Sequence, residues 1–467
     1  MDLLRASALE QAELLRRKEI SSVELTRLYL DRIRSLDEKI GAFVTVSEKH
    51  ALRAAEEADR ILAHTTAETE ARTPFLGVPT AIKDLHPTRD AWTHFGSRAF
   101  VVPPLFDCPT AKSLRKAGFV FVGKTAASEF GALPVTEPDG RPPTRNPWNL
   151  DFTAGGSSGG AAAAVAAGLL PIAHGSDGGG SVRIPSSVCH LFGFKPSRWL
   201  LPNAYGKTDP NVLYTCGAIA RTVSDAAAMI DVMMQSTAQH ALRFQPCALL
   251  PQLRDPAPRG LRIRMLLNNP LAEPTPAIVA ATRRVGQILA ELGHHVEEAV
   301  YPGAELEDFI PIWGRVVGEM PAIFPWRMQS VTKWLREEGK RFPNADISRM
   351  EVHLTSVVRK VLDGADILLS PTLSLEPLRV GALHGLSGKD AFHKAAPMGA
   401  FTAPYNLTGQ PAATVPVGLS AEGLPIGVQL AAAHQKDALV LQVCRELEEA
   451  IVWANHWSPV SGLASPS

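Results

Sequence analysis

The sequence predicts an α/β fold, because strand-like and helix-like segments alternate along the chain. Short apolar segments rich in β-branched residues are separated by segments with helical spacing or helix-favouring composition. Hydrophobic residues make up 45% of the 467 residues and charged residues 20%, which is typical of a globular protein and too apolar for a disordered one. No internal repeat divides the chain, so we expect a single domain over residues 1–467.

The N-terminal segment, residues 1–63, is expected to be helical. Ser21 followed by Glu24 fits a capping box, and apolar residues then recur at helical spacing, which predicts two or three amphipathic helices. The first twenty residues contain no uninterrupted apolar stretch of the signal-peptide type, and no later stretch reaches about 18 apolar residues. The sequence therefore predicts a cytoplasmic protein without a membrane partner.

The next part of the chain contains two predicted strands and one unusual helix. LGVPTAIKDL (76–85) is a short apolar segment that carries Lys83 to the end of a strand, and FVFVGKT (119–125) predicts a second buried strand. AAAAVAAGLL (161–170) predicts a helix of small residues, which can pack its backbone very close to its neighbours. This composition implies that the helix is buried.

The C-terminal half continues the alternation. LRIRMLL (261–267) and ADILLSPTL (365–373) predict strands, and residues 278–293 predict a helix that ends at a glycine. Residues 413–433 predict a tight pair of strands. Residues 301–360 are rich in tryptophan and phenylalanine, which indicates either an insertion that covers a substrate pocket or an ordinary aromatic helical layer.

Charge and cysteine content exclude several classes of partner. The chain has 47 Lys and Arg against 47 Asp and Glu, so nothing in its net charge favours nucleic acid or an anionic membrane. The cysteines are odd in number and without any CxxC pair, which argues against both a disulfide framework and a zinc site. We expect reduced, mostly buried thiols at these positions: Cys108, Cys189, Cys216, Cys247 and Cys444. No cluster of metal ligands is evident, so no cofactor is expected.

Residues 155–185, GGSSGGAAAAVAAGLLPIAHGSDGGGSVRIP, contain two serine clusters separated by the small-residue helix. A flexible linker should border exposed polar sequence, whereas this stretch leads directly into a helix that must be buried. The pattern G-x-S-x-G around Ser157 matches the nucleophile elbow of an α/β-hydrolase-type esterase, but no apolar strand precedes it. A phosphate-binding loop is also disfavoured, because this stretch lacks the lysine that such a loop requires.

The remaining interpretation joins the two clusters in one active site. Gly178, Gly179 and Gly180 place consecutive backbone N–H groups beside Ser181, as an oxyanion hole requires, so Ser181 is the candidate nucleophile. Serine needs a base, and no histidine lies in an obvious catalytic context, which makes Lys83 the candidate. Burial or a nearby cation would have to lower its pKa. The alternative is a structural lysine paired with Asp84.

The two clusters and the helix between them resemble the long signature of the amidase signature family. GVPTAIKDL, RNPWN, GAIARTVSDAA, ILLSPT and FTAPYNLTGQPAATVPVG are similar to further landmarks of that family and occur in its order, so the resemblance covers nearly the whole chain. The resemblance implies a large mixed central sheet covered by helices on both faces. It also implies a serine amidase in which Ser181 is acylated, Ser157 bridges through a cis peptide bond after Gly156, and Lys83 is the terminal base.

The same resemblance gives roles to neighbouring residues. The backbone amides of Gly178, Gly179, Gly180 and Ser181 are expected to form the oxyanion hole. Substrate-binding or supporting roles are expected for a further set: Gly131, Ser158, Asp177 and Arg183. The implied mechanism is acyl transfer to water and requires no metal or organic cofactor.

Departures from the family pattern bear on the substrate. Gly178 and Ala126 are smaller than the residues many relatives carry, which indicates a roomier pocket, and Ile184 replaces the glutamine typical of tRNA-dependent amidotransferase subunits. The amino-acid sequences of these motifs most resemble those of nylon-oligomer hydrolases, aryl acylamidases and urethane-cleaving amidases. We expect a small-molecule amide or carbamate substrate, with a partner-dependent glutamine amidotransferase subunit as the alternative. The oligomeric state, including a homodimer, stays open.

Overall fold

The computed structural model describes residues 2–64, 66, 72–202, 213–235, 247–301 and 305–463. Its central sheet contains eight strands: β6 (Ile172–Asp177), β7 (Phe192–Lys195), β8 (Thr215–Ala220), β9 (Arg262–Leu266), β10 (His295–Ala299), β11 (Ile367–Pro371), β12 (Ala412–Leu419) and β13 (Pro425–Ala432). Their order is β10-β9-β11-β13-β12-β7-β8-β6. Strands β10, β9 and β11 are parallel to one another and the remaining neighbours are antiparallel, so the predicted mixed sheet is confirmed.

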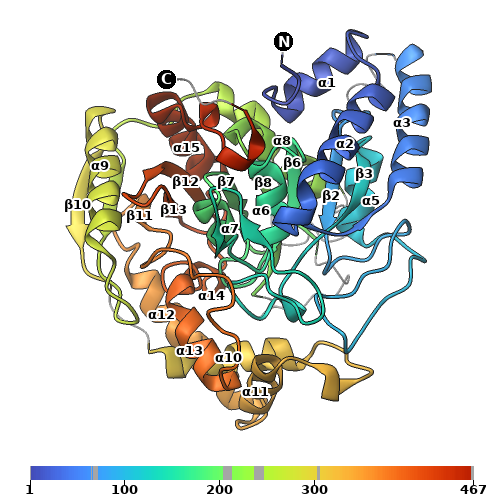
Figure 1. Ribbon diagram of the computed structural model, residues 1–467. Coiled ribbons are helices and arrows are strands. Elements are labelled where there is room, and N and C mark those ends of the chain that lie inside the picture. The colour runs from blue at the N-terminus through green and yellow to red at the C-terminus, as the bar shows by residue number, and fades with distance from the viewer. Residues whose placement is uncertain are drawn as a thin grey trace.

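Helices cover both faces of this sheet (Figure 1). On β8, Ala218 and Ala220 join the core shared with α8 (Val223–Met234), α9 (Pro276–Glu291) and α15 (Asp437–Ile451). Ile219 between them points to the opposite core, shared with several other helices: α6 (Gly159–Ala166), α7 (Arg183–Val188), α10 (Leu306–Gly318), α11 (Ser330–Glu338), α12 (Asn344–Lys360) and α13 (Gly388–Ala395). A strand buried on both faces is apolar at successive positions, which explains the continuous apolar segments in the sequence.

The strand that carries Lys83 belongs to a separate, smaller sheet. β2 (Pro79–Lys83), β3 (Val120–Thr125) and β1 (Phe43–Val46) form a three-stranded sheet of order β1-β3-β2. This small sheet contacts the large sheet at its edge strand β6. The Thr80 hydroxyl on β2 donates to the carbonyl of Ile172 on β6 at 2.9 Å. Both predicted strands are therefore confirmed, and β2 ends at Lys83 as expected.

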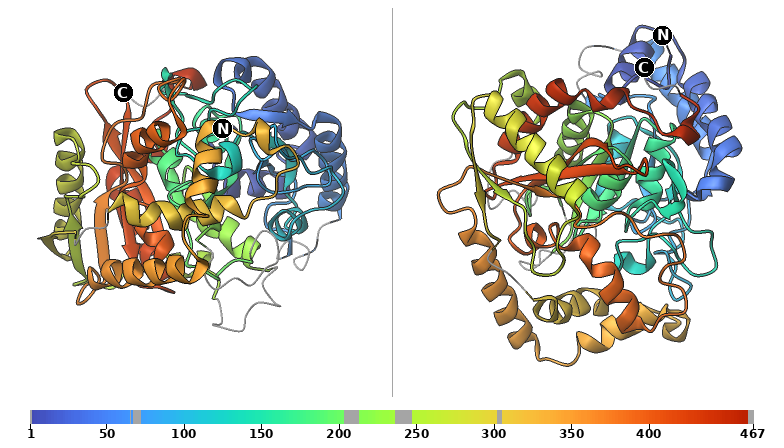
Figure 2. Two further views of the ribbon diagram at one scale, coloured as in Figure 1. Left: turned by 90° about the horizontal axis from the view of Figure 1, so that it is seen from below. Right: turned by 60° about the vertical axis from the view of Figure 1, so that its left-hand side comes forward.

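The N-terminal segment contains α1 (Ala8–Arg16), α2 (Ser22–Ile40) and α3 (Glu48–Ala63), with the capping box of Ser21 and Glu24 at the start of α2. The short strand β1 between α2 and α3 was not predicted, because a four-residue segment carries too little periodicity. Both chain ends lie on the same side of the molecule (Figure 2). No helix in the described part of the chain is both long and apolar enough to cross a bilayer.

The C-terminal elements follow the sequence prediction closely. β9 and β11 form at the two expected segments, β12 and β13 form the antiparallel pair, and α9 ends before Gly293, whose φ is +93°. The aromatic segment forms α10, α11 and α12, which lie together at the foot of the molecule in Figure 1. The remaining α-helices and strands are short: α5 (Pro109–Lys116), β4 (Arg145–Asn146), β5 (Asn149–Thr153) and α14 (Pro404–Leu407).

Candidate active site

Lys83 lies at the end of β2 with its side chain fully buried. Its ammonium group Nζ donates to Ser157 Oγ at 2.7 Å and to the carbonyl of Ser176 at 3.1 Å. Within the described part of the chain Lys83 forms no ion pair, and the carboxylate of Asp84 instead accepts from the backbone N–H of His94 at 3.2 Å. The alternative of a structural Lys83–Asp84 pair is therefore wrong.

The environment of Lys83 favours its neutral form. Burial lowers the pKa of Lys83 to about 7, because a charged ammonium loses its hydration in the interior, and the negative charge of Asp177 offsets only part of this effect. The ordinary pKa of lysine is about 10.4. A large fraction of Lys83 is therefore uncharged near neutral pH and able to accept a proton.

Ser157 is held from several sides. The peptide bond between Gly156 and Ser157 is cis, as the family resemblance implied. Gly156 has no room for a side chain, since a Cβ there would lie 2.7 Å from the backbone nitrogen of Val135. Gly131 packs against the hydroxyl of Ser157, because a Cβ on Gly131 would lie 3.3 Å from Ser157 Oγ. Gly131 therefore leaves space beside the Ser157 hydroxyl.

The small-residue helix α6 brings the two serine clusters together. Its close packing depends on Gly160, where a Cβ would lie 2.4 Å from the backbone nitrogen of Ala126. Ser158 lies just before α6, and its backbone N–H donates to the carbonyl of Ser181 at 3.2 Å. The Ser158 hydroxyl donates to the carbonyl of Ser176 at 3.3 Å, the same carbonyl that Lys83 contacts. The two halves of the glycine-rich stretch are therefore directly adjacent.

Ser181 lies in the loop between β6 and α7 and is 7% exposed. The backbone N–H of Gly180 is already engaged, since it donates to Asp177 Oδ1 at 2.8 Å. The amides of Gly178, Gly179 and Ser181 form no hydrogen bond with another residue of the described chain. These three amides are therefore the free donors beside Ser181, one fewer than the sequence indicated.

A buried ion pair fixes this loop. Arg183 contacts Asp177 through two bonds of 2.9 Å, and both side chains are fully buried. Arg183 also donates to the carbonyl of Thr402 at 2.9 Å, to Gln429 at 2.7 Å and to Asn406 at 2.7 Å. Burial alone would raise the pKa of Asp177, but the charge and hydrogen bonds of Arg183 outweigh it and hold that pKa well below its usual range.

Sequence reasoning found Asp177 and Arg183 but missed the residues that complete their network. Asn406 Nδ2 donates to the carbonyl of Asp177 at 2.9 Å, and the Thr402 hydroxyl donates to the carbonyl of Gly179 at 2.7 Å. Both residues lie in the stretch FTAPYNLTGQ, which carried the family resemblance without a role for each position. They hold the shape of the loop that presents Ser181.

The sequence profile of the family described as Amidase matches residues 24–441. The chain belongs to the amidase family. The 6-aminohexanoate-cyclic-dimer hydrolase of Paenarthrobacter ureafaciens is 34% identical over 482 residues, which cover 96% of this chain and 95% of that protein. A solved structure of 6-aminohexanoate cyclic dimer hydrolase complexed with substrate superposes with a TM-score of 0.86 at 28% identity and covers 99% of this chain and 100% of that one. A bacterial aryl acylamidase superposes with a TM-score of 0.83 at 26% identity and 99% coverage of both chains.

As a member of this family, the amidase hydrolyses amide C–N bonds. Ser181 opens onto a cavity of about 850 Å³ whose lining is almost entirely apolar. Helix α10 of the aromatic segment supplies part of the cavity wall through Leu306, Phe309 and Trp313. A second cavity of about 490 Å³ meets the first at Gly131, Ser181 and Trp313, and it also contacts Ser157. Ser181 therefore lies where the two cavities meet, and Ser157 lines the smaller one.

The two small positions that were expected to give a roomier pocket differ in their surroundings, because Gly178 lines the smaller cavity and Ala126 does not. Ala126 lines neither cavity. Its backbone N–H donates to the carbonyl of Ala42, and its carbonyl accepts from the backbone N–H of Gly160. At Gly178 a Cβ would lie 3.1 Å from the indole ring of Trp313, so a larger side chain there would press on that ring. Trp313 is fixed there by a hydrogen bond from its Nε1 to the carbonyl of Ala132 at 3.1 Å. The pocket is thus shaped by a tryptophan distant in sequence.

Proposed function

We propose that this amidase is a serine hydrolase that forms an acyl-enzyme on Ser181 and moves protons through Ser157 to Lys83. The contact of 2.7 Å between Lys83 Nζ and Ser157 Oγ carries the proposal, because it joins a buried amine to one of the two candidate serines. The pKa of about 7 for Lys83 supports its role as the base. Neither serine is bonded to a described histidine, which leaves the lysine as the base.

Each step can be assigned to a group in the site. Ser181 Oγ attacks the amide carbon as its proton passes to Ser157 Oγ, and the Ser157 proton passes to neutral Lys83. The free amides of Gly178, Gly179 and Ser181 stabilise the negative oxygen that develops on the tetrahedral intermediate. The C–N bond then breaks while the proton returns through Ser157 to the leaving nitrogen. Water attacks the acyl-enzyme by the same relay and regenerates Ser181.

The two cavities indicate the class of substrate. The larger cavity beside Ser181 is lined almost only by apolar side chains, among them Leu271, Phe309, Trp313 and Phe392. Such a surface favours bulky aliphatic or aryl groups, because their burial contributes roughly 25 cal/mol per Å² of apolar area. We therefore propose hydrophobic amides as substrates, with aryl carbamates and esters as side substrates, and with acyl and amine portions in separate cavities.

The alternative of a glutamine amidotransferase subunit fits this lining less well. Glutamine carries a free ammonium and a free carboxylate, and burying these charges without partners is costly. Among the described residues, Glu305 is the one charged side chain that lines the larger cavity. An α/β-hydrolase-type esterase is excluded by the fold and the family. The protein therefore needs no ammonia-accepting partner in this proposal.

The cysteines support a cytoplasmic location in this proposal. All five are free, with four buried and Cys247 exposed, which agrees with the expectation of mostly buried thiols. Structural disulfides persist mainly in oxidising compartments. Unpaired cysteines, together with the absence of a membrane-spanning helix among the described residues, fit a protein of the cytoplasm.

A substrate panel tests the proposal directly. The wild type should hydrolyse p-nitroanilides of hydrophobic acids faster than small primary amides or glutamine, and Ser181→Ala should hydrolyse none of them. Ser113→Ala is the matched control, because Ser113 is a buried serine on α5 whose hydroxyl bonds only locally, to the carbonyl of Pro109. Intact mass spectrometry with an aryl carbamate should show one carbamoyl adduct on wild type and none on Ser181→Ala. An adduct on the variant would exclude Ser181 as the nucleophile.

A further inference from the structure

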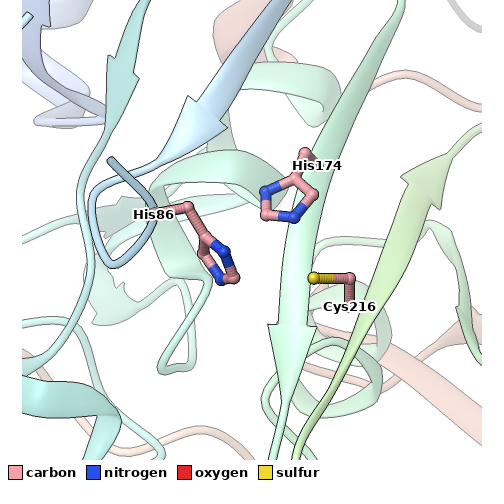
Figure 3. A group of neighbouring side chains, drawn as sticks. All are labelled: His86, His174 and Cys216. Carbon is pink, nitrogen blue, oxygen red and sulfur yellow. The ribbon is translucent and has the colours of Figure 1, made fainter. Parts of the chain in front are cut away.

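Three side chains outside the catalytic relay converge in a buried space next to it. His86 lies just after β2, His174 lies on β6, and Cys216 lies on the neighbouring strand β8 (Figure 3). One ligand atom of each, a ring nitrogen or the sulfur, lies within 4.8 Å of those of the other two. His86 and Cys216 are 2% exposed and His174 is fully buried.

The ring nitrogens of this cluster lack hydrogen-bond partners. Both nitrogens of His174 and the Nδ1 of His86 are buried and unbonded within the described part of the chain. The two rings pack edge to face with their centroids 4.6 Å apart, which satisfies none of these nitrogens. Buried polar atoms in folded proteins are paired in the large majority of cases, and an unpaired one is costly. Three unpaired nitrogens in one place are atoms that a bound ion or ordered water would satisfy.

We propose that His86, His174 and Cys216 bind one thiophilic metal ion, monovalent copper. Two imidazoles and one thiolate form a set of soft and borderline ligands, which selects copper(I) or zinc over magnesium or calcium. Nitrogen and sulfur bind such ions at about 2.0–2.1 Å and about 2.3 Å, so the side chains close inward by small rotations when the ion enters. The proposal is independent of the acyl-transfer mechanism.

The strand register explains why two of these ligands meet. β6 and β8 are antiparallel, with Ser176 opposite Cys216 and His174 opposite Ala218. His174 and Cys216 are therefore diagonal neighbours on one face of the sheet, within reach of each other's side chains. His86 comes from the other sheet and is fixed by its backbone, because its carbonyl accepts a hydrogen bond from Lys124.

The charge of the surroundings favours a monovalent ion. Binding forms two metal–nitrogen bonds and one metal–sulfur bond and releases the Cys216 proton to solvent. Copper(I) with one thiolate is then neutral, whereas a divalent ion leaves one positive charge. Lys83 and Lys124 both act electrostatically on His174, so an additional buried positive charge there would be repelled. A neutral metal–thiolate unit avoids this repulsion.

The ion has a route to the site through the catalytic cavity. His86 lines the cavity of about 490 Å³ together with Ser157 and Ser181, whereas His174 and Cys216 do not line it. An ion that enters from the cavity therefore meets His86 first.

The test uses the full-length protein in a Cys247→Ser background, which removes the one exposed thiol. Copper(I) is titrated anaerobically against a chromogenic chelator, and zinc is titrated in parallel. The parent should retain one copper(I) per chain with sulfur and nitrogen ligands in its X-ray absorption spectrum. Cys216→Ala and His174→Ala should each weaken retention by more than about 100-fold, since even the loss of a residue that only hydrogen-bonds a ligand typically costs about 10- to 100-fold.

Cys444→Ala is the matched control, because Cys444 is a fully buried thiol on α15 outside the cluster. It should retain copper(I) like the parent. The unfolding midpoint and the rate of amide hydrolysis of each variant show whether it is folded. Failure of the parent to hold copper(I), or equal retention by folded Cys216→Ala and Cys444→Ala, would overturn the site. Retention of zinc but not copper(I) would overturn the assignment to a monovalent ion.

Discussion

Replacing Lys83 with methionine removes the proposed base while it keeps a side chain of similar length. In the wild type the pKa of Lys83 is about 7, so about half of the protein carries the neutral amine at pH 7. An ordinary lysine would be neutral in only about one molecule in 2,500 at that pH. The kcat/KM for amide hydrolysis should therefore rise about tenfold per pH unit below pH 7 and level off above it.

The same shift makes a prediction about stability. The unfolded chain binds a proton at Lys83 up to about pH 10.4, whereas the folded protein releases it above about pH 7. Between these values the unfolded state holds more protons, so the stability of the wild type rises with pH relative to Lys83→Met. The total change across this window is on the order of 5 kcal/mol, at 1.36 kcal/mol per pKa unit.

Two measurements check both parts. Denaturant unfolding of wild type and Lys83→Met between pH 6 and pH 10.5 gives the stability difference, and the hydrolysis of a p-nitroanilide gives the rate profile. Lys195→Met is the matched control, because burial also lowers the pKa of Lys195 to about 7 while its Nζ donates to the carbonyl of Pro196. It should show a similar stability effect and retain the rate profile. A pH-independent wild-type rate, or an active Lys83→Met enzyme, would refute the role of Lys83.

Three further substitutions probe the rest of the site. Ser181→Ala should lower kcat for an anilide by at least about 10⁴-fold without changing the unfolding midpoint, and turnover near the wild-type rate would contradict it. Arg183→Met should destabilise the fold by about 3–5 kcal/mol, because it leaves Asp177 buried without its partner, and adding Asp177→Asn should recover part of the loss in denaturant unfolding. Trp313→Ala should cost about 3–5 kcal/mol and raise KM for aryl amides, whereas an unchanged KM would place the substrate elsewhere.

The part of the site that the sequence could predict is the part with strong local chemistry. Glycine and serine in two clusters around a small-residue helix leave few alternatives to close backbone packing, and α6 has that packing at Gly160. Lys83 was identifiable because an apolar strand ends at it. These features depend on neighbours in sequence, and pattern reasoning detects such neighbours.

The remaining features depend on contacts between segments distant in sequence. Trp313 fills the space above Gly178, and no pattern near either residue signals that contact. Asn406 and Gln429 reach Arg183 from the far end of the chain. His174 and Cys216 become neighbours only through the register of β6 and β8. The local sequence does not specify pairing between strands or the direction of a side chain.

A lowered lysine pKa alone does not identify the base. Burial lowers the pKa of Lys83 and Lys195 to about 7 and that of Lys124 to about 8, so all three amines are partly neutral near physiological pH. Lys195 donates to a backbone carbonyl, and Lys124 donates to Thr93 and to the carbonyl of His86. Thr93 lines neither cavity, whereas the partner of Lys83 is Ser157, which lines the cavity that Ser181 also lines. A neutral amine can act on a substrate only through groups that it contacts, and of these three lysines Lys83 alone contacts a hydroxyl that lines the cavity beside Ser181.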